Sequence, residues 1–150
     1  MPDSAMPRDK ERARLVLGLG CERGTPDAEL LDLAETVLAG RVVFAVATLD
    51  MRAGEPAMLA VARRLDVPLV TFDAARLEAE TPRLANPSAV VFAHAGCHGV
   101  AEAAALAAAG AGGRLVVPKT KSARATAAIA ESFQAAGGAA SSIDSMQEAV

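Results

Sequence analysis

Short apolar runs alternate along this chain with segments of helical periodicity, and this alternation constrains the fold more than any other feature. Residues 15–19 and 42–48 are apolar at nearly every position and lead into glycine or polar residues. Such runs are typical of strands that are buried on both faces. Between them, residues 30–38 place leucine, alanine and valine at the spacing of one helix face. The alternation predicts an α/β fold: a three-layer α/β/α domain with about five strands, in a mostly parallel sheet that has room for an antiparallel pair.

The boundaries of the elements follow from the same patterns and from helix start and stop signals. Thr25 and Pro26 suit the N-cap and the first position of a helix that Gly40 ends. Strands are expected at residues 15–19, 42–48, 68–72, 89–93 and 115–117. Further helices are expected from residue 56 onward and at residues 74–80, 100–109 and 122–136. Residues 1–12 are expected to be a flexible tail and 13–136 a single domain, with 137–150 left unassigned.

Composition excludes several functional classes. The chain has no Trp or Tyr and a net charge of −3, so it offers neither stacking platforms nor a general basic field for nucleic acid. No apolar run is long enough to cross a bilayer, and the N-terminal residues lack the apolar centre of a signal peptide. We therefore expect a cytoplasmic protein without membrane or nucleic-acid partners, in which Cys21 and Cys97 are reduced thiols.

Glycine-rich and charged loops follow the expected strands, at the edge where α/β sheets bind ligands. The first loop has the spacing G-x-G-x-x-x-G and leads from a strand into a helix, which is the setting of an anion site. It is longer than the dinucleotide fingerprint and lacks the acidic residue that should follow. A tight turn that binds no ligand is the competing interpretation. The candidate ligand-binding residues of this loop are Gly18, Gly20, Cys21, Arg23 and Gly24.

The second loop, residues 48–55, combines acidic and basic side chains at a strand end. Its candidate ligand-binding residues are Thr48, Asp50, Arg52 and Glu55. Glu55 also suits the N-terminus of the next helix without any ligand, because a carboxylate stabilises the positive end of the helix dipole. Arg52 is less easily explained in this way, because a cation gains nothing at the N-terminal end of a helix.

The third loop, residues 94–99, contains both histidines of the chain and the candidate ligand-binding residues Gly96 and Gly99. His98, together with Glu102 one turn into the next helix, is a candidate for acid/base catalysis. A helix-capping role is the alternative for Glu102. The His and Cys spacing matches no structural zinc pattern, and we expect neither a metal nor another cofactor.

The fourth loop, residues 117–124, places three cations in front of an expected helix, where the helix dipole disfavours them. An anionic ligand would explain that arrangement. Lys119 follows the strand directly and is the candidate ligand-binding residue. Lys121 and Arg124 fit a solvated basic loop better.

Taken in order, segments of these loops resemble the motifs of a known family. They are residues 17–25 (LGLGCERGT), 47–50 with Glu55 and Pro56, 99–106 (GVAEAAAL), and 116–121 (VVPKTK) with 125–130 (ATAAIA). From about residue 15 to 131 the chain resembles the cobalamin-biosynthesis CobE / CbiG C-terminal domain family. The resemblance implies work on the corrin ring in vitamin B12 synthesis. In two-domain members the whole enzyme opens a lactone ring on a cobalt-precorrin and releases acetaldehyde.

Three functional hypotheses remain open at this point. The chain resembles a stand-alone form of the family's C-terminal domain, which implies binding or processing of a carboxylated precorrin or corrinoid. Hydrolase-like action on a precorrin is implied if the chain is catalytic. Arg23, Arg52 and Lys119 would then pair with carboxylates of the ligand. The alternatives are a nucleotide- or phosphate-binding α/β enzyme and a non-catalytic partner of another corrin-pathway enzyme.

Overall fold

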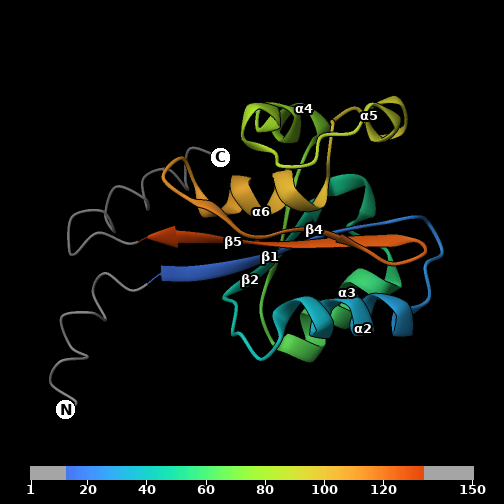
Figure 1. Cartoon of the computed structure of the whole chain (residues 1–150). Coiled ribbons are helices and arrows are strands. Elements are labelled where there is room, and N and C mark those ends of the chain that lie inside the picture. The colour runs from blue at the N-terminus through green and yellow to red at the C-terminus, as the bar shows by residue number, and fades with distance from the viewer. Residues whose placement is uncertain (1–12, 134–150) are drawn as a thin grey trace, which may run out of the picture.

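The computed structural model describes residues 13–133, which form a five-stranded sheet with helices on both faces (Figure 1). The strands are β1 (Ala13–Cys21), β2 (Ala45–Leu49), β3 (Leu69–Phe72), β4 (Arg114–Lys121) and β5 (Ala125–Phe133). The helices are α2 (Asp27–Leu38), α3 (Pro56–Leu65), α4 (Ala74–Glu78), α5 (Ala89–Ala95) and α6 (Ala101–Ala109), with 3₁₀ turns η1 (Asp50–Arg52) and η2 (Thr81–Arg83). The predicted α/β fold with five strands is confirmed. The expected tail and residues 137–150 lie outside the described residues.

The sheet is mixed, and one strand alone runs against the rest. Its order is β3-β2-β1-β5-β4. The β1–β2 and β2–β3 pairs are parallel, whereas β5 is antiparallel to both of its neighbours, β1 and β4. Strands β1, β2, β3 and β4 therefore point the same way. Their carboxyl ends meet at one edge of the sheet, and the β4–β5 turn lies at that edge as well.

The strand expected at residues 89–93 is wrong, because this segment is helix α5. The hydroxyl of Ser88 accepts a hydrogen bond from the Val91 N–H at 3.2 Å, which caps the start of the helix. Gly96 ends the helix in the left-handed conformation, with φ of 82°. These two local signals outweigh the strand propensity of the Val-Val-Phe run between them.

The helix expected at residues 122–136 is also wrong as far as residue 133, because residues 125–133 form β5. Every residue of β5 is paired with a residue of β1, from Ala13 opposite Phe133 to Cys21 opposite Ala125. The other edge of β5 pairs with β4. The alanine-rich sequence favours a helix locally, but helix propensity is a weak preference that pairing on both edges overrides.

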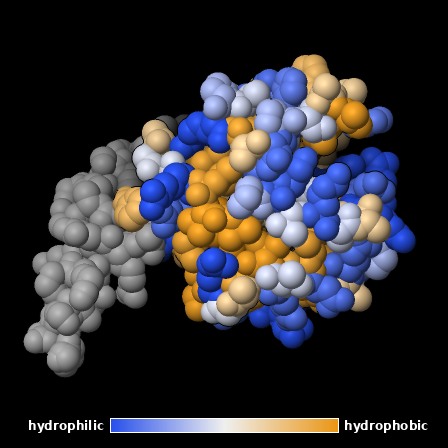
Figure 2. All heavy atoms as spheres, in the orientation of Figure 1, coloured by the Kyte–Doolittle hydropathy of each residue, from blue (hydrophilic) through white to orange (hydrophobic). Residues whose placement is uncertain are grey.

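Helices α2 and α3 cover one face of the sheet, and α6 covers the other, with α4 and α5 outside it (Figure 1). Helix α6 is buried almost all round, and its alanines let it lie very close to β1. The tightest point is Gly18, where an added Cβ would overlap the Ala101 carbonyl oxygen and lie 2.8 Å from the Ala105 nitrogen. The face seen in Figure 2 shows apolar surface between the two helical layers, where the sheet reaches the surface. Within residues 13–133, no helix has the length and apolar character needed to cross a membrane.

Candidate functional site

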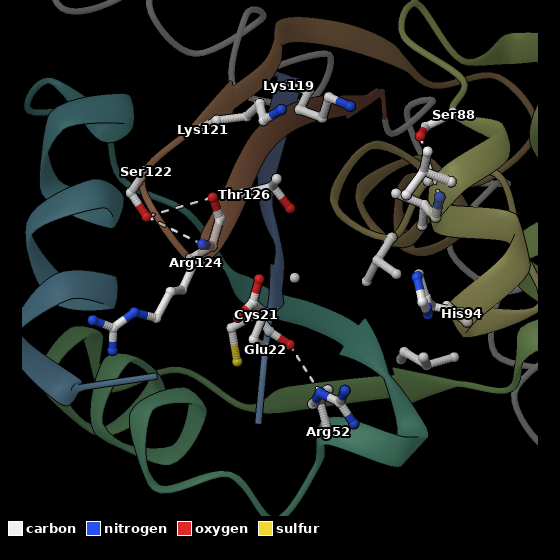
Figure 3. A pocket seen from close by; sticks show the side chains of 18 of the residues that line it. Cys21, Glu22, Arg52, Ser88, His94, Lys119, Lys121, Ser122, Arg124 and Thr126 are labelled. Carbon is white, nitrogen blue, oxygen red and sulfur yellow. Dashed lines mark hydrogen bonds between the residues drawn. The ribbon is translucent and has the colours of Figure 1, made fainter. Parts of the chain in front are cut away.

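A pocket of about 750 Å³ lies at the carboxyl edge of the strands (Figure 3). Its walls come from the loop after β1, the end of β2 with η1, helix α5, the start of α6, and the β4–β5 turn. All four loops that were singled out in the sequence therefore contribute to it. The volume falls within the range of small-molecule sites, which is roughly 300–1,000 Å³.

Cations dominate the charged lining of the pocket. The basic side chains that line it are Arg23, Arg52, Lys119, Lys121 and Arg124, whereas Glu22 is the one carboxylate among the described lining residues. Figure 3 shows Lys119 and Lys121 across the pocket from Arg52, with Cys21 and Thr126 between them. Opposite cationic walls of this kind suit a ligand that carries several anionic groups.

Arg52 is fixed in place by the main chain of the first loop. Its Nε donates a hydrogen bond to the Cys21 carbonyl at 2.8 Å, which joins the second loop to the end of β1. The guanidinium retains further N–H donors for a carboxylate or another anion. The two loops meet a second time where the Glu55 carboxylate accepts the Gly24 N–H at 3.1 Å.

One wall of the pocket is apolar and comes mainly from α5. Val90, Val91 and Ala95 line it, and Val100 continues it at the start of α6. Val90 is 69% exposed, and no side chain of α5 is buried. This wall presents apolar surface to the pocket opposite the cationic loops.

The β4–β5 turn is anchored from the opposite face of the sheet. The Glu29 carboxylate of α2 accepts the Arg124 N–H at 2.6 Å and the Ser122 hydroxyl at 2.5 Å. These bonds, the one from Ser122 foremost, hold the pKa of Glu29 below its usual value. Thr25 does not cap α2 as expected, because its hydroxyl donates to the Glu22 carbonyl at 2.7 Å and Pro26 occupies the N-cap. The Glu22 N–H donates to the Arg124 carbonyl at 3.0 Å, so the turn that carries Arg124 is tied to the first loop as well as to α2.

Six of the residues selected from the sequence line the pocket. They are Gly20, Cys21, Arg23, Arg52, Gly99 and Lys119. The Cys21 thiol is partly exposed there, and partial burial, followed by the charge of Glu55, raises its pKa. Cys21 is therefore a neutral thiol at neutral pH.

The other selected residues lie outside the lining, and contacts within the protein account for several of them. Gly18 faces α6, and the Thr48 hydroxyl is buried and donates to the Leu19 carbonyl at 2.7 Å. The Gly24 N–H donates its hydrogen bond to the Glu55 carboxylate, as described above. Gly96 ends α5, and Asp50 begins the η1 turn.

The two residues selected for acid/base catalysis are also absent from the pocket lining. The His98 Nδ1–H donates to the Glu78 carboxylate, whose two oxygens lie 2.9 and 3.0 Å from Nδ1, and the His98 ring stacks on Phe92 with ring centroids 4.5 Å apart. The bond from His98 holds the pKa of Glu78 below its usual value. The Glu102 carboxylate is only 2% exposed and accepts hydrogen bonds from main-chain and side-chain N–H groups. Their assignment to catalysis stays a prediction.

Sequence reasoning missed part of the pocket. Ser88, Val90, Val91 and His94 of the α5 wall were not selected, nor were Ser122 and Thr126 of the β4–β5 hairpin. The first group was hidden by the strand expected at residues 89–93, and the second by the helix expected from residue 122. The Ser88 cap and Gly96 were signals that would have revealed α5. Within the described residues, no group of three or more His, Cys, Asp or Glu side chains is placed to hold a metal ion.

The mixed sheet with helices on both faces and a pocket at its carboxyl edge defines an α/β domain, and comparison with known proteins gives the family. Residues 15–130 match the family described as cobalamin synthesis G C-terminus. The chain belongs to this family and is a cobalamin biosynthesis protein. It is 57% identical to Protein CobE of Sinorhizobium sp. over 126 residues, which cover 81% of this chain and 82% of that protein.

Two further similarities agree with this assignment. The chain is 32% identical to the cobalt-precorrin-5A hydrolase of Priestia megaterium over 77% of its length, but it spans only 32% of that enzyme. The crystal structure of CobE, a protein from the cobalamin (vitamin B12) biosynthetic pathway, matches with a TM-score of 0.74 and 36% identity, over 80% of this chain and 91% of that one. The cobalamin biosynthesis protein chiG of Agrobacterium tumefaciens str. C58 matches with a TM-score of 0.61 and 34% identity, over 79% and 98% of the two chains.

Proposed function

We propose that the pocket binds a carboxylated precorrin or another corrinoid intermediate of cobalamin biosynthesis. The observation that carries this proposal is the lining itself: five cations and one carboxylate around about 750 Å³, with an apolar wall on α5. Corrinoid intermediates carry acetate and propionate groups around a flat apolar ring. The lysines and Arg52 on opposite walls would pair with carboxylates on opposite sides of the ring. Val90 and Val91 would contact the ring itself.

The pocket supports binding more directly than it supports a reaction. A nucleophile and a base in hydrogen-bond contact are the usual sign of covalent catalysis. Among the described lining residues, Cys21 is a neutral thiol and the Ser88 hydroxyl caps α5. The proposal therefore assigns a binding role to the site and names no catalytic residue.

A visible-absorbance titration with hydrogenobyrinic acid tests the proposal. The ring reports on its own environment, which matters because the chain has no Trp or Tyr. We expect a saturable spectral shift at micromolar concentrations. Lys119→Ala should weaken binding by about tenfold, because a charge-assisted hydrogen bond contributes about 1.5 kcal/mol.

Arg63→Ala is the matched control for this titration. Arg63 is exposed on α3, outside the pocket lining, so removing its charge should leave affinity unchanged. A flat titration of the unsubstituted protein would overturn the proposal. Equal losses in the two variants would show that net charge, rather than the pocket, attracts the ligand. Thermal stabilisation by a nucleotide, with none by the corrinoid, would favour a nucleotide-binding enzyme.

A further inference from the structure

Strand β4 carries an irregularity at the point where it supplies Lys119 to the pocket. Val117 is opposite Ile129 of β5, and the next matched pair is Thr120 opposite Ala127. Three steps along β4 therefore correspond to two steps along β5, so one extra residue is accommodated at positions 118 and 119. Such a bulge leaves ladder groups unpaired and turns the direction of a side chain. Pro118 has no N–H to donate, but Lys119 has one that needs a partner.

The partner of the Lys119 N–H is the side chain of Glu102 on α6. The N–H donates to Glu102 Oε2 at 2.8 Å, in place of a bond within the sheet. Glu102 reaches β4 from the buried helix, and it is only 2% exposed. The contact therefore links the core of the domain directly to the bulge that carries a pocket cation.

The same carboxylate is held from the other side by the segment that leads into α5. Glu102 Oε1 accepts the main-chain N–H groups of Ala85 and Asn86, both at 2.9 Å. Oε2 also accepts the Asn86 side-chain amide at 2.9 Å. Burial by itself would raise the pKa of Glu102, but the bonds from Lys119, Asn86 and Ala85 outweigh it, and the pKa lies below its usual value. Glu102 is thus an ionised carboxylate with four donors around it.

We propose that Glu102 is a positioning residue of the pocket: it holds the β4 bulge in the conformation that directs Lys119 toward the ligand. The inference rests on the proposed function of the pocket. It also gives the glutamate a role different from the acid/base role expected from the sequence, because its oxygens are already engaged by N–H donors. Glu102 acts on a ligand only through Lys119.

A double-mutant cycle measures whether Glu102 acts through Lys119. Glu102→Gln keeps the size of the side chain but replaces one oxygen with an NH₂ group. The two main-chain N–H groups of Ala85 and Asn86 hold the remaining oxygen, so the new NH₂ group faces the Lys119 N–H. Both groups are hydrogen-bond donors, so the bond to Lys119 is lost. We expect Glu102→Gln to weaken hydrogenobyrinic acid binding by about tenfold. In a Lys119→Ala background the same substitution should cause no further loss.

The matched control is Glu80→Gln. Glu80 is a second buried carboxylate, bonded by Arg76 and Arg83, and it does not line the pocket. Its substitution should lower stability without changing affinity. Losses from Glu102→Gln that add to those of Lys119→Ala would mean that Glu102 acts on the pocket generally, and would overturn the inference. Unchanged affinity in Glu102→Gln would overturn it as well.

Amide hydrogen exchange followed by NMR tests, without a ligand, whether Glu102 holds the Lys119 N–H. We expect the Lys119 N–H to be protected in the unsubstituted protein and to exchange faster in Glu102→Gln, with the Ala127 N–H of β5 unchanged. If Glu102→Gln does not fold, Glu102→Asp is used, whose shorter side chain should also release the Lys119 N–H. Fast exchange at Lys119 in the unsubstituted protein would overturn the inference. If that protein gives no spectral shift with the corrinoid, the proposed function fails, while the exchange data still decide whether Glu102 holds the bulge.

Discussion

Replacing Gly18 with alanine should destabilise the whole domain, because there is no room for a methyl group between β1 and α6. An added Cβ would overlap the Ala101 carbonyl oxygen and lie 2.8 Å from the Ala105 nitrogen and 2.9 Å from the Ala105 Cβ. Two of these three atoms belong to the main chain of α6, so no side-chain rotation relieves the clash. The helix would have to move away from the strand against which it packs.

The magnitude follows from that geometry. Overpacking a core typically costs about 1–3 kcal/mol, and a clash with main-chain atoms belongs at the upper end. We therefore expect Gly18→Ala to lower the free energy of unfolding by about 3 kcal/mol. At about 2–4 °C per kcal/mol for a domain of this size, the midpoint of thermal unfolding should fall by about 6–12 °C.

Urea unfolding followed by far-ultraviolet circular dichroism is the suitable assay, because the chain lacks Trp and Tyr. Gly112→Ala is the matched control, since an added Cβ there meets open space and the residue has no left-handed φ. Its stability should stay within about 0.5 kcal/mol of the unsubstituted protein. A Gly18→Ala variant of normal stability that no longer binds hydrogenobyrinic acid would refute the packing argument and make Gly18 a ligand contact.

Three further predictions follow from titrating groups and from packing. The pKa of Glu102 is lower in the folded protein than its ordinary value of 4.5, so its stabilising contribution is complete above that pH and is lost as pH falls below it. Urea unfolding between about pH 3 and 7 should therefore show a shallower acid loss in Glu102→Gln, and identical slopes would contradict this. The pKa of Cys21 is raised above 9.0, so iodoacetamide should label its thiol slowly at neutral pH and faster at alkaline pH. Rapid labelling at neutral pH would be inconsistent with a neutral thiol. Helix α5 buries no side chain, so its amide hydrogens should exchange with solvent faster than those of α6. Exchange in α5 should become slower when the corrinoid binds. Equal exchange rates in the two helices would count against a loosely packed wall.

The fold class was predictable because most elements carry strong local signals. The β1 run, the α2 periodicity and the α3 start at Pro56 all lie where the sequence placed them. The two errors have different physical causes. Residues 89–95 form a short apolar run, for which periodicity does not separate strand from helix, and only the caps decide. Residues 125–133 form a strand because β1, more than a hundred positions away, supplies the pairing.

The candidate site was predictable to the extent that it depends on the direction of the strands. Arg52 and Lys119 follow strand ends or lie near them, and strands that point the same way bring such residues to one edge. The role of Glu102 was not predictable. Its partners are main-chain N–H groups of two distant segments, and one of them is free to bond only because β4 has a bulge.

The place of β5 between β1 and β4 has a consequence for how the chain folds as it is made. Strand β1 is synthesised early, yet its partner on one side is the last described strand, and Ala13 pairs with Phe133. Until β5 emerges, one edge of β1 has unpaired N–H and C=O groups, and an open strand edge is a template for association with other chains. Pairing between such distant segments is also slow to form. A chain that ends before β5 should therefore aggregate rather than fold into a smaller version of the domain.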